Sequence, residues 1–238
     1  MPHGMQADMK AEVKRSGELF DDWPETYDRW FATPIGTLVK EYEERLLHDM
    51  LKPRRHDLLL DVGCGTGIFT AGVLDAGSRV VGMDISRPML SVAAGRFGGG
   101  RFMPLTGDMR SLPFSDNSFD KVYSMTAIEF VEDARSVVDE FERVVKPGGT
   151  IVLTTLNRLS PWAESRLRKA DSGHELFQSI LFRTPAEMRG LVPDDAMVKT
   201  AIHFLKTDDP VRARRIEAQG SAERRETGAF LAVCWMKR

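Results

Sequence analysis

The chain has 238 residues, of which 42% are hydrophobic and 29% are charged, and its formal net charge is −2 at pH 7. The length suits one α/β domain with a cap better than two small domains, and the composition is that of an ordinary soluble globular protein. A net charge so close to zero gives no electrostatic case for a nucleic acid as the main partner.

The cysteine spacing and the lengths of the apolar runs indicate the cellular compartment of the protein. Cys64 and Cys234 lie far apart and lack the spacing of metal ligands, which favours a reducing cytoplasm and predicts no metal site. No apolar run is long enough to span a membrane. Residues 1–17 have no apolar core of signal-peptide type and are expected to be a loose, polar lead-in. We therefore expect a cytoplasmic protein that binds no membrane.

Residues 18–57 form a separate amino-terminal piece, in which an aromatic cluster leads into an amphipathic helix. The aromatic side chains either pack on the core in the ordinary way or cover a substrate. We expect this piece to be a helical lid over the carboxyl edge of a sheet that follows it. The cluster consists of Trp23, Tyr27, Trp30 and Phe31.

Between residues 58 and 157, short apolar runs alternate with helical stretches. Such alternation predicts right-handed crossovers and a mostly parallel, doubly wound sheet that is covered on both faces. The last helical stretch, 131–149, ends in a stop signal of one proline and two glycines. The predicted strands are 58–62, 79–84, 101–108, 119–127 and 150–157, the other predicted helices lie within 68–77 and 86–97, and the stop signal is Pro147, Gly148 and Gly149.

The rest of the chain predicts an insertion and two more strands. Residues 157–195 are longer than a plain crossover needs, and we expect them to form a cap that faces the amino-terminal lid. Residues 196–206 and 228–237 have β-like patterns, and the polar link between them lacks a convincing buried helix. We expect these strands to pair antiparallel at a sheet edge, giving an α/β fold with a seven-stranded sheet and an antiparallel edge strand in one domain over 1–238.

The segment "LLLDVGCGTGIFT", residues 58–70, places three glycines directly behind the strand that contains Asp61. Glycines in this position let the backbone turn tightly or let a ligand approach closely. In an open α/β sheet, ligands bind beyond the carboxyl ends of the strands. The next strand ends in Asp84, whose carboxylate can accept both hydrogens of a ribose diol, so the pattern predicts a nucleoside site. The alternative is a tight connection without a ligand, with Asp84 as a turn or capping residue. The glycines are Gly63, Gly65 and Gly67.

Four stretches, in this order over residues 55–160, resemble the five motifs of the class I S-adenosylmethionine-dependent methyltransferases, and the third stretch covers the third and fourth motifs. The chain is most similar to the small-molecule branch that includes the ubiquinone and menaquinone biosynthesis methyltransferases. The resemblance implies a Rossmann-like methyltransferase fold with residues 58–156 as the cofactor-binding core, S-adenosylmethionine as cofactor and S-adenosylhomocysteine as product. The four stretches are "LLLDVGCGTGIFT", "VVGMDIS", "LTGDMRSLPFSDNSFDKVYSMTAIEFVED" and "VVKPGGTIVLTTLN".

The resemblance also implies a role for individual residues of the cofactor site. The glycine turn would border the methionine part, together with Asp61 and Cys64, and no reactive thiol is expected at Cys64. Asp84 would hold the ribose hydroxyls. Asp108 would accept a hydrogen bond from the adenine amino group, or would serve as a turn residue. The other implied positions are Ile85 along the adenine, Met109 beside its ring, Thr126 and Ala127 near the sulfonium, Tyr27 over the methionine end, and Gly67 at the start of the helix behind it.

The implied activity is transfer of a methyl group to a small organic acceptor by in-line displacement. The stretch "SMTAIEF" stands where an Asn/Asp-Pro-Pro-aromatic signature would follow the fourth strand, which argues against amide, adenine-amino and guanidine-like nitrogens. The alternatives are a cofactor-binding module without turnover that acts through a protein partner, and an RNA or protein methyltransferase. The methylated atom, the acceptor and the oligomeric state stay open.

Two histidines are candidates for acid–base catalysis. His174 lies within the cap insertion, which should face the acceptor, and it is the catalytic candidate. His203 lies in an alternating strand, where a structural histidine with satisfied hydrogen bonds is the favoured interpretation.

Overall fold

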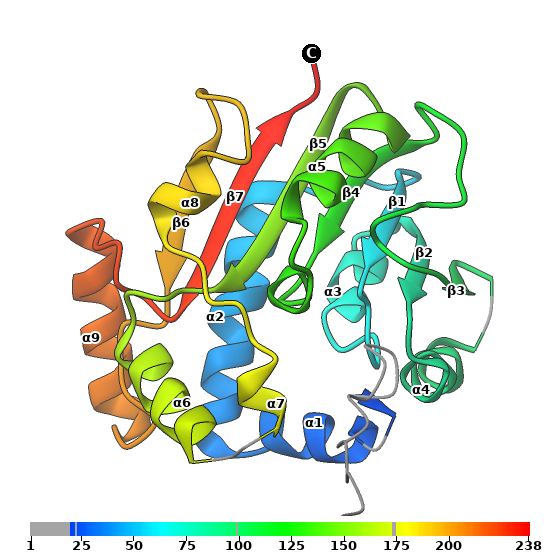
Figure 1. Cartoon of the computed structure of the whole chain (residues 1–238). Helices are drawn as coiled ribbons and strands as arrows, with labels where there is room; N and C mark the ends of the chain where they lie inside the picture. The colour runs from blue at the N-terminus through cyan, green and yellow to red at the C-terminus, as the bar shows by residue number, and fades with distance from the viewer. Residues whose placement is uncertain (1–19, 22, 99, 173–174) are drawn as a thin grey trace, which may run out of the picture.

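Figure 1 shows the computed structural model of the chain. Two sequence predictions, the loose lead-in of residues 1–17 and the catalytic role of His174, fall outside the residues that the structure describes. None of the described helices is both long enough and apolar enough to cross a membrane. The described residues are 20, 21, 23–98, 100–172 and 175–238.

The amino-terminal piece contains two helices, α1 (Pro24–Phe31) and α2 (Pro34–Leu51). Thr33 separates them, and its hydroxyl oxygen accepts a hydrogen bond from the Gly36 amide at 3.1 Å. A side-chain cap followed by a proline is a favourable start for a helix, and it fixes where α2 begins. Helix α2 packs along one face of the sheet, whereas α1 lies across the edge where the parallel strands end (Figure 1).

Seven strands form one sheet in the order β3-β2-β1-β4-β5-β7-β6. Strands β1 to β5 are parallel to one another, and β7 pairs antiparallel with both β5 and β6. The predicted fold class and the antiparallel pairing of the last two strands are thus confirmed. Strand order reverses between β1 and β4, the place where open α/β sheets bind ligands. The strands are β1 (Leu58–Val62), β2 (Arg79–Asp84), β3 (Phe102–Thr106), β4 (Phe119–Ser124), β5 (Val145–Leu156), β6 (Met197–Ala201) and β7 (Phe230–Met236).

Helices cover both faces of the sheet (Figure 1). Helices α2, α3, α4 and α9 pack on one face, and α5 and α8 pack on the other. Helices α6 and α7 follow β5 and lie at the same carboxyl edge as α1. The bounds are α3 (Thr70–Asp75), α4 (Arg87–Phe97), the 3-10 helix η2 (Ile128–Phe130), α5 (Ala134–Val144), α6 (Pro161–Asp171), α7 (Glu175–Gln178), α8 (Pro185–Arg189) and α9 (Pro210–Ala222).

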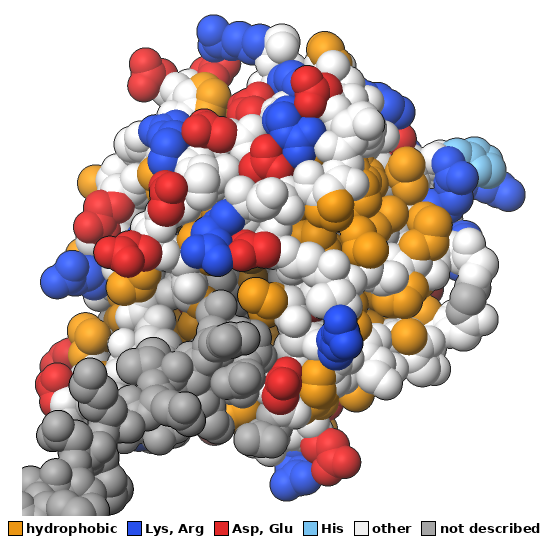
Figure 2. Space-filling view, turned by 45° about the vertical axis from the view of Figure 1, so that its right-hand side comes forward, with side chains coloured by type: hydrophobic (Ala, Val, Ile, Leu, Met, Phe, Trp, Pro, Cys, Tyr) orange, Lys and Arg blue, Asp and Glu red, His pale blue; other side chains and the backbone are white. Residues whose placement is uncertain are grey.

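The centre of the sheet is buried on both sides. Leu59 and Leu60 are neighbours on β1, yet they belong to hydrophobic clusters on opposite faces, and both are fully buried. This burial explains why the strand reads as a continuous apolar run. Strand β3 forms one edge of the sheet and leaves Met103 exposed, and Figure 2, turned to bring that side forward, shows hydrophobic side chains gathered on the surface.

The prediction that the link between the last two strands lacks a buried helix is wrong. Helix α9 lies there, and the Asp209 carboxylate accepts hydrogen bonds from the amides of Val211 and Arg212, both at 3.0 Å, at its start. Glu217 on this helix is buried against His203, so the inner face of α9 is partly polar. Hydrophobic periodicity therefore misses this helix, although a capping aspartate followed by a proline marks its start.

The predicted helix stop at Pro147, Gly148 and Gly149 is also misplaced. Helix α5 ends at Val144, and β5 begins at the next residue, so the three residues lie within the strand. The register between β4 and β5 shifts at this point, which absorbs the extra residues. Gly148 has a φ of 75°, and its amide donates to the Lys237 carbonyl at 2.8 Å.

Candidate functional site

A cavity of about 670 Å³ opens at the carboxyl edge of the sheet. Its walls come from α1 and α2, from the residues after β1, β2, β3 and β4, from η2 and α6, and from the loop after β6. Of the sequence-predicted cofactor residues, Gly67 is outside these walls. The others line the cavity: Tyr27, Asp61, Gly63, Cys64, Gly65, Asp84, Ile85, Asp108, Met109, Thr126 and Ala127.

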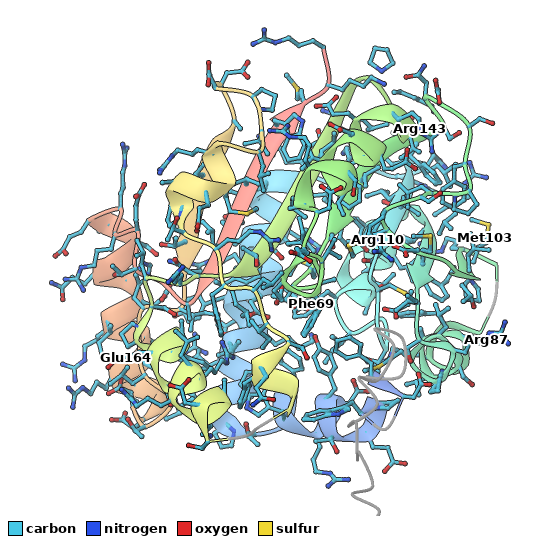
Figure 3. The ribbon with its side chains drawn as sticks, in the orientation of Figure 1. Phe69, Arg87, Met103, Arg110, Arg143 and Glu164 are labelled. Atoms are coloured by element: carbon cyan, nitrogen blue, oxygen red, sulfur yellow. The ribbon has the colours of Figure 1, made fainter. Side chains whose placement is uncertain are left out.

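The lid and cap segments meet at the same cavity. Trp23, Tyr27, Trp30 and Phe31 line it from the amino-terminal piece. Phe31 is also buried in the core, where its ring packs edge-on against Phe69 at 5.5 Å between centroids, so this residue both packs on the core and lines the cavity. Figure 3 labels Phe69 and Arg110 in the middle of the molecule, and both line the cavity. From the cap segment, Trp162 and Phe177 line the cavity, whereas Phe182 does not line it and is buried in a small cluster against which Phe177 packs.

The three glycines of the turn differ in what surrounds them. All have a positive φ, which side chains rarely adopt. A Cβ on Gly63 would lie 2.4 Å from the Ala127 Cβ, and one on Gly67 would lie 2.5 Å from the Phe97 ring, so both are needed for packing. A Cβ on Gly65 would meet no atom within 4 Å. Gly65 therefore keeps open a space in the cavity that the protein itself does not fill.

The Asp84 carboxylate is held at the end of β2 by backbone donors. Its two oxygens accept hydrogen bonds from the amides of Gly65 at 2.8 Å and Ser86 at 2.9 Å. Burial raises the pKa of Asp84, although these amide hydrogen bonds oppose that rise. The carboxylate thus shapes the glycine turn, and each oxygen retains capacity for a further donor from the cavity. The structural and the ligand-binding interpretations of this residue are compatible.

Asp61 carries an unsatisfied oxygen. Its Oδ2 accepts hydrogen bonds from the hydroxyls of Thr70 at 2.6 Å and Tyr123 at 2.8 Å, whereas Oδ1 is buried and has no hydrogen-bond partner among the described residues. Burial raises the pKa of Asp61 to about 7. A buried carboxylate oxygen without a partner is costly, and a ligand ammonium or a bound water would remove that cost. This unpaired oxygen, together with the open space at Gly65, fits the amino-acid end of S-adenosylmethionine.

Asp108 has a partner that the sequence reading missed. The Arg110 guanidinium contacts both carboxylate oxygens at 2.6 to 3.1 Å and, with a further bond from its own amide, holds the pKa of Asp108 below its usual range. Arg110 also lines the cavity. The expected hydrogen bond from an adenine amino group would therefore go to a carboxylate that is already paired. Ionised Asp108 remains an acceptor-only group, which suits that role.

Two residues on the cavity have strained backbones. Thr126 has a φ of 46° and Ile202 a φ of 67°, although both are β-branched and strongly disfavour this region. The Thr126 amide donates to the Thr154 hydroxyl at 2.9 Å, which holds the strained turn after β4. Tyr27 reaches this turn from α1, where burial raises the pKa of its phenol well above the usual range and a hydrogen bond with the Thr126 side chain opposes that rise. Strain of this kind gathers at functional sites.

Two buried carboxyl groups face the cavity beyond Thr126, and the sequence analysis identified neither. Glu129 on η2 is 1% exposed and Glu43 on α2 is 6% exposed. Burial raises the pKa of Glu129 to about 7 and that of Glu43 to about 8, and the positive charge of Arg166 on α6 opposes both rises. The Thr155 hydroxyl donates to Glu129 at 3.3 Å. Carboxyl groups whose pKa values lie near neutrality can take up or release a proton in this pH range.

His203 lies away from the cavity, as the structural interpretation predicts. Its Nδ1 lies 3.1 Å from a Glu217 oxygen, and both side chains are 2% exposed. Burial alone would lower the pKa of His203, but the hydrogen bond and charge of Glu217 outweigh it and raise the pKa. The burial of Cys64 raises the pKa of its thiol well above the usual value, which leaves it unreactive.

The fold and the cavity define a Rossmann-like α/β protein with a cavity at the switch point of its sheet. Residues 60–153 match the family described as "Methyltransferase domain".

Curated relatives support the same assignment. The chain is 33% identical over 152 residues to a malonyl-[acyl-carrier protein] O-methyltransferase of Erwinia billingiae, with 63% of this chain and 55% of that protein covered. It is 32% identical over 154 residues to a demethylmenaquinone methyltransferase of Clavibacter sepedonicus, with 63% of this chain and 61% of that protein covered. The chain therefore spans little more than half the length of these relatives.

Solved structures resemble the fold over nearly the whole chain. A SAM-dependent methyltransferase of Thermotoga maritima, described as a possible histamine N-methyltransferase, matches with a TM-score of 0.69 at 21% identity and covers 94% of this chain and 100% of its own. Phosphoethanolamine N-methyltransferase 2 of Haemonchus contortus, solved with phosphomonomethylethanolamine and S-adenosylhomocysteine, matches with a TM-score of 0.68 at 17% identity, covering 94% of this chain and 60% of its own. At these identities the likeness shows the fold.

Proposed function

We propose that the protein transfers a methyl group from S-adenosylmethionine to a small organic acceptor and releases S-adenosylhomocysteine. The observation that carries this proposal is one cavity with two ends. One end has the glycine turn, the unpaired Asp61 oxygen and the Asp84 carboxylate, and the other has aromatic walls and two buried carboxyl groups. The family match and the methyltransferase relatives support the same reaction class.

The cofactor, when bound, supplies a sulfonium whose S–CH₃ bond breaks as the bond from the methyl carbon to the acceptor forms. The protein's part is to bind, orient and exclude water. Gly65 leaves room for close approach, Asp84 accepts from the ribose hydroxyls, and Asp61 Oδ1 accepts from the ammonium of the methionine part. Tyr27, which reaches Thr126 from α1, shields the point where the two ends of the cavity meet.

Glu129 is the general base that takes the proton of the methyl acceptor. A protonated oxygen or nitrogen nucleophile must lose its proton as the new bond forms. Glu129 lies on the short helix that follows the strained turn at Thr126, faces the cavity, and has a pKa of about 7 because it is buried. Its carboxylate form can take the proton, while Arg166 stabilises the charge before transfer.

The acceptor and the compartment are part of the proposal. The formal net charge of −2 disfavours a nucleic acid, and the two relatives named above have a malonyl-carrier and a demethylmenaquinone acceptor in their names, which supports an organic acceptor in preference to RNA. Cys64 and Cys234 are free thiols, which supports a reducing compartment such as the cytoplasm.

Two measurements test the proposal. Calorimetry should show saturable binding of S-adenosylhomocysteine with micromolar-scale affinity. Incubation with methyl-labelled S-adenosylmethionine and a low-molecular-weight cell extract should then yield labelled product and S-adenosylhomocysteine in equal amounts. Binding without turnover would support the silent cofactor-binding module instead. Label in the RNA or protein of a whole extract, and not in small molecules, would support a macromolecular acceptor.

A further inference from the structure

Three cationic side chains line the end of the cavity far from Asp84. Arg166 and Lys169 come from α6, and Lys206 comes from the loop after β6. Arg166 is half-buried, whereas the two lysines are exposed at the mouth. In Figure 1, α6 lies at the opposite side of the carboxyl edge from α4 and the end of β2, so these cations are remote from the predicted ribose site.

Aromatic rings fix the position of the lysine side chains. The Lys206 ammonium lies 5.4 Å from the ring centroid of Trp30 and 5.3 Å from that of Trp162. The Lys169 ammonium lies 5.9 Å from the ring centroid of Phe177. Attraction between a cation and the face of a ring restrains an otherwise flexible side chain. Both ammonium groups are therefore held at the cavity mouth.

Neither lysine has a carboxylate partner among the side chains that the structure describes. Burial lowers the pKa of Lys206, and the charges of Arg166 and Lys169 lower it further, so the charges that act on this lysine are both positive. The two buried carboxyl groups act on Arg166, and neither is among the groups that shift the pKa of Lys206. A group of like charges at the mouth of a cavity attracts an anion and concentrates it there.

The wall next to these cations is apolar. A small hydrophobic cluster of the cap includes Phe130, Leu156 and Ile180, and all three line the same cavity as the lysines and Glu129. A ligand that fills this part of the cavity therefore meets an apolar wall. Its middle part is therefore best matched by apolar or aromatic groups.

We infer that the methyl acceptor is an organic anion whose carboxylate or phosphate group is held by Lys169 and Lys206 while its apolar body packs on the cap cluster. This inference rests on the proposed function, since it names the class of acceptor for that site. The anionic group is an anchor at the mouth, and the atom to be methylated lies further in, toward Thr126 and Glu129. The proton then leaves that inner atom for Glu129, and the anchor keeps its charge throughout.

Three small probes test this inference with the protein saturated by S-adenosylhomocysteine. Benzoate and phenyl phosphate carry the two candidate anions on the same ring, and benzamide is the neutral isostere of benzoate. Titration by ligand-observed NMR should give at least about tenfold tighter binding of one or both anions than of benzamide, because charge-assisted hydrogen bonds contribute that much. The anion that binds more tightly indicates whether the acceptor carries a carboxylate or a phosphate.

The preference should disappear in the double variant Lys169→Gln/Lys206→Gln. The matched control is Arg168→Gln/Lys199→Gln, which removes two exposed charges outside the cavity, one of them on the same helix. It should keep the wild-type preference. Binding of both anions no tighter than that of benzamide, no binding of either anion, or an anion preference that survives in the Lys169→Gln/Lys206→Gln protein would overturn the inference. Failure to bind S-adenosylhomocysteine at all would instead overturn the proposed function.

Discussion

The two ends of the cavity are built in different ways. The end at the glycine turn uses short stretches directly after β1, β2, β3 and β4, and its polar contacts involve backbone amides, as at Gly65 and Ser86. The other end uses side chains from α1, α2, η2, α6 and the loop after β6, which are far apart in sequence.

This difference separates what the fold fixes from what the chain can vary. Backbone donors at strand ends follow from the sheet itself, so the turn can serve one cofactor for many acceptors. Side chains such as Arg166, Lys169 and Lys206 can change without disturbing the sheet, and we propose that they select the acceptor. Variants at each end can therefore be tested separately.

Glu129→Gln tests the acceptor end. Methyl transfer to the labelled small-molecule product should fall by about 10²- to 10⁴-fold, the usual contribution of a general base. Affinity for S-adenosylhomocysteine should stay at the wild-type value, because Glu129 lies outside the predicted cofactor contacts. A variant that retains wild-type turnover would remove Glu129 from the reaction.

The pH profile sharpens the same prediction. Burial raises the pKa of Glu129, and Thr155, Arg166 and Arg183 oppose that rise, with a resulting pKa of about 7. Only the deprotonated carboxylate can accept a proton, so the wild-type rate should rise as pH increases through about 7. The residual rate of the Gln variant should lack this step. A wild-type rate that is flat from pH 6 to 8 contradicts the assignment.

Asp84→Ala tests the cofactor end. Loss of a carboxylate that accepts from the ribose hydroxyls leaves polar groups unpaired in a closed site and should weaken S-adenosylhomocysteine binding by about 2–3 kcal/mol, roughly 30- to 150-fold. The control is Asp195→Ala, at an exposed aspartate that pairs with Arg238. Calorimetry that finds equal affinities for the Asp84 and Asp195 variants would place Asp84 outside the site.

Gly65→Ala and Gly98→Ala separate backbone strain from ligand space. Both glycines have a positive φ, and a Cβ on either meets no protein atom within 4 Å. Each variant should lose about 1–2 kcal/mol of folding free energy because of the left-handed backbone. Only Gly65→Ala should weaken cofactor binding, by about 1–2 kcal/mol, since its methyl group enters the cavity. Equal binding by both variants would show that the turn is only a tight connection.

The His203–Glu217 pair offers a test outside the cavity. The pKa of His203 is raised, so its contribution to stability is present below its unfolded pKa and is lost as pH rises through the folded value. The pKa of Glu217 is lowered because the hydrogen bond and charge of His203 outweigh the effect of burial. The contribution of Glu217 to stability is therefore lost as pH falls through its folded-state pKa. Denaturant unfolding should show that His203→Gln costs on the order of 1 kcal/mol at pH 6 and less at pH 9. S-adenosylhomocysteine binding should be unchanged.

The cofactor end could be predicted from the sequence because its residues lie within a few positions of each other. Asp61 and the glycines are adjacent in one strand–turn unit, and Asp84 ends the next strand, so motif spacing alone places them together. Motif spacing does not predict the role of Arg110, because its pairing with Asp108 depends on the side-chain direction after β3. No short-range sequence pattern indicates this ion pair.

The acceptor end could not be assembled in this way. Glu129 is only one letter in "SMTAIEF", and its buried contacts come from residues distant in the chain, the Thr155 hydroxyl and the Leu181 amide. Glu43 and Arg166 lie on helices 123 positions apart in the chain (166 − 43), and only tertiary packing brings their charges together. Helix α9 was missed for a related reason, since Glu217 is buried by pairing with His203 and leaves no apolar stripe.

Helix α1 connects the two ends and gives the most direct test of the account. Its Asp28 accepts a hydrogen bond from the Thr66 hydroxyl of the glycine turn at 2.6 Å, and its Trp30 contacts Lys206 at the mouth. Hydrogen exchange should be measured with and without S-adenosylhomocysteine. The account predicts slower exchange on binding in residues 63–67 and in Pro24–Phe31, with α9 unchanged. Binding that leaves exchange in the glycine turn unaltered would contradict the claim that this turn holds the cofactor.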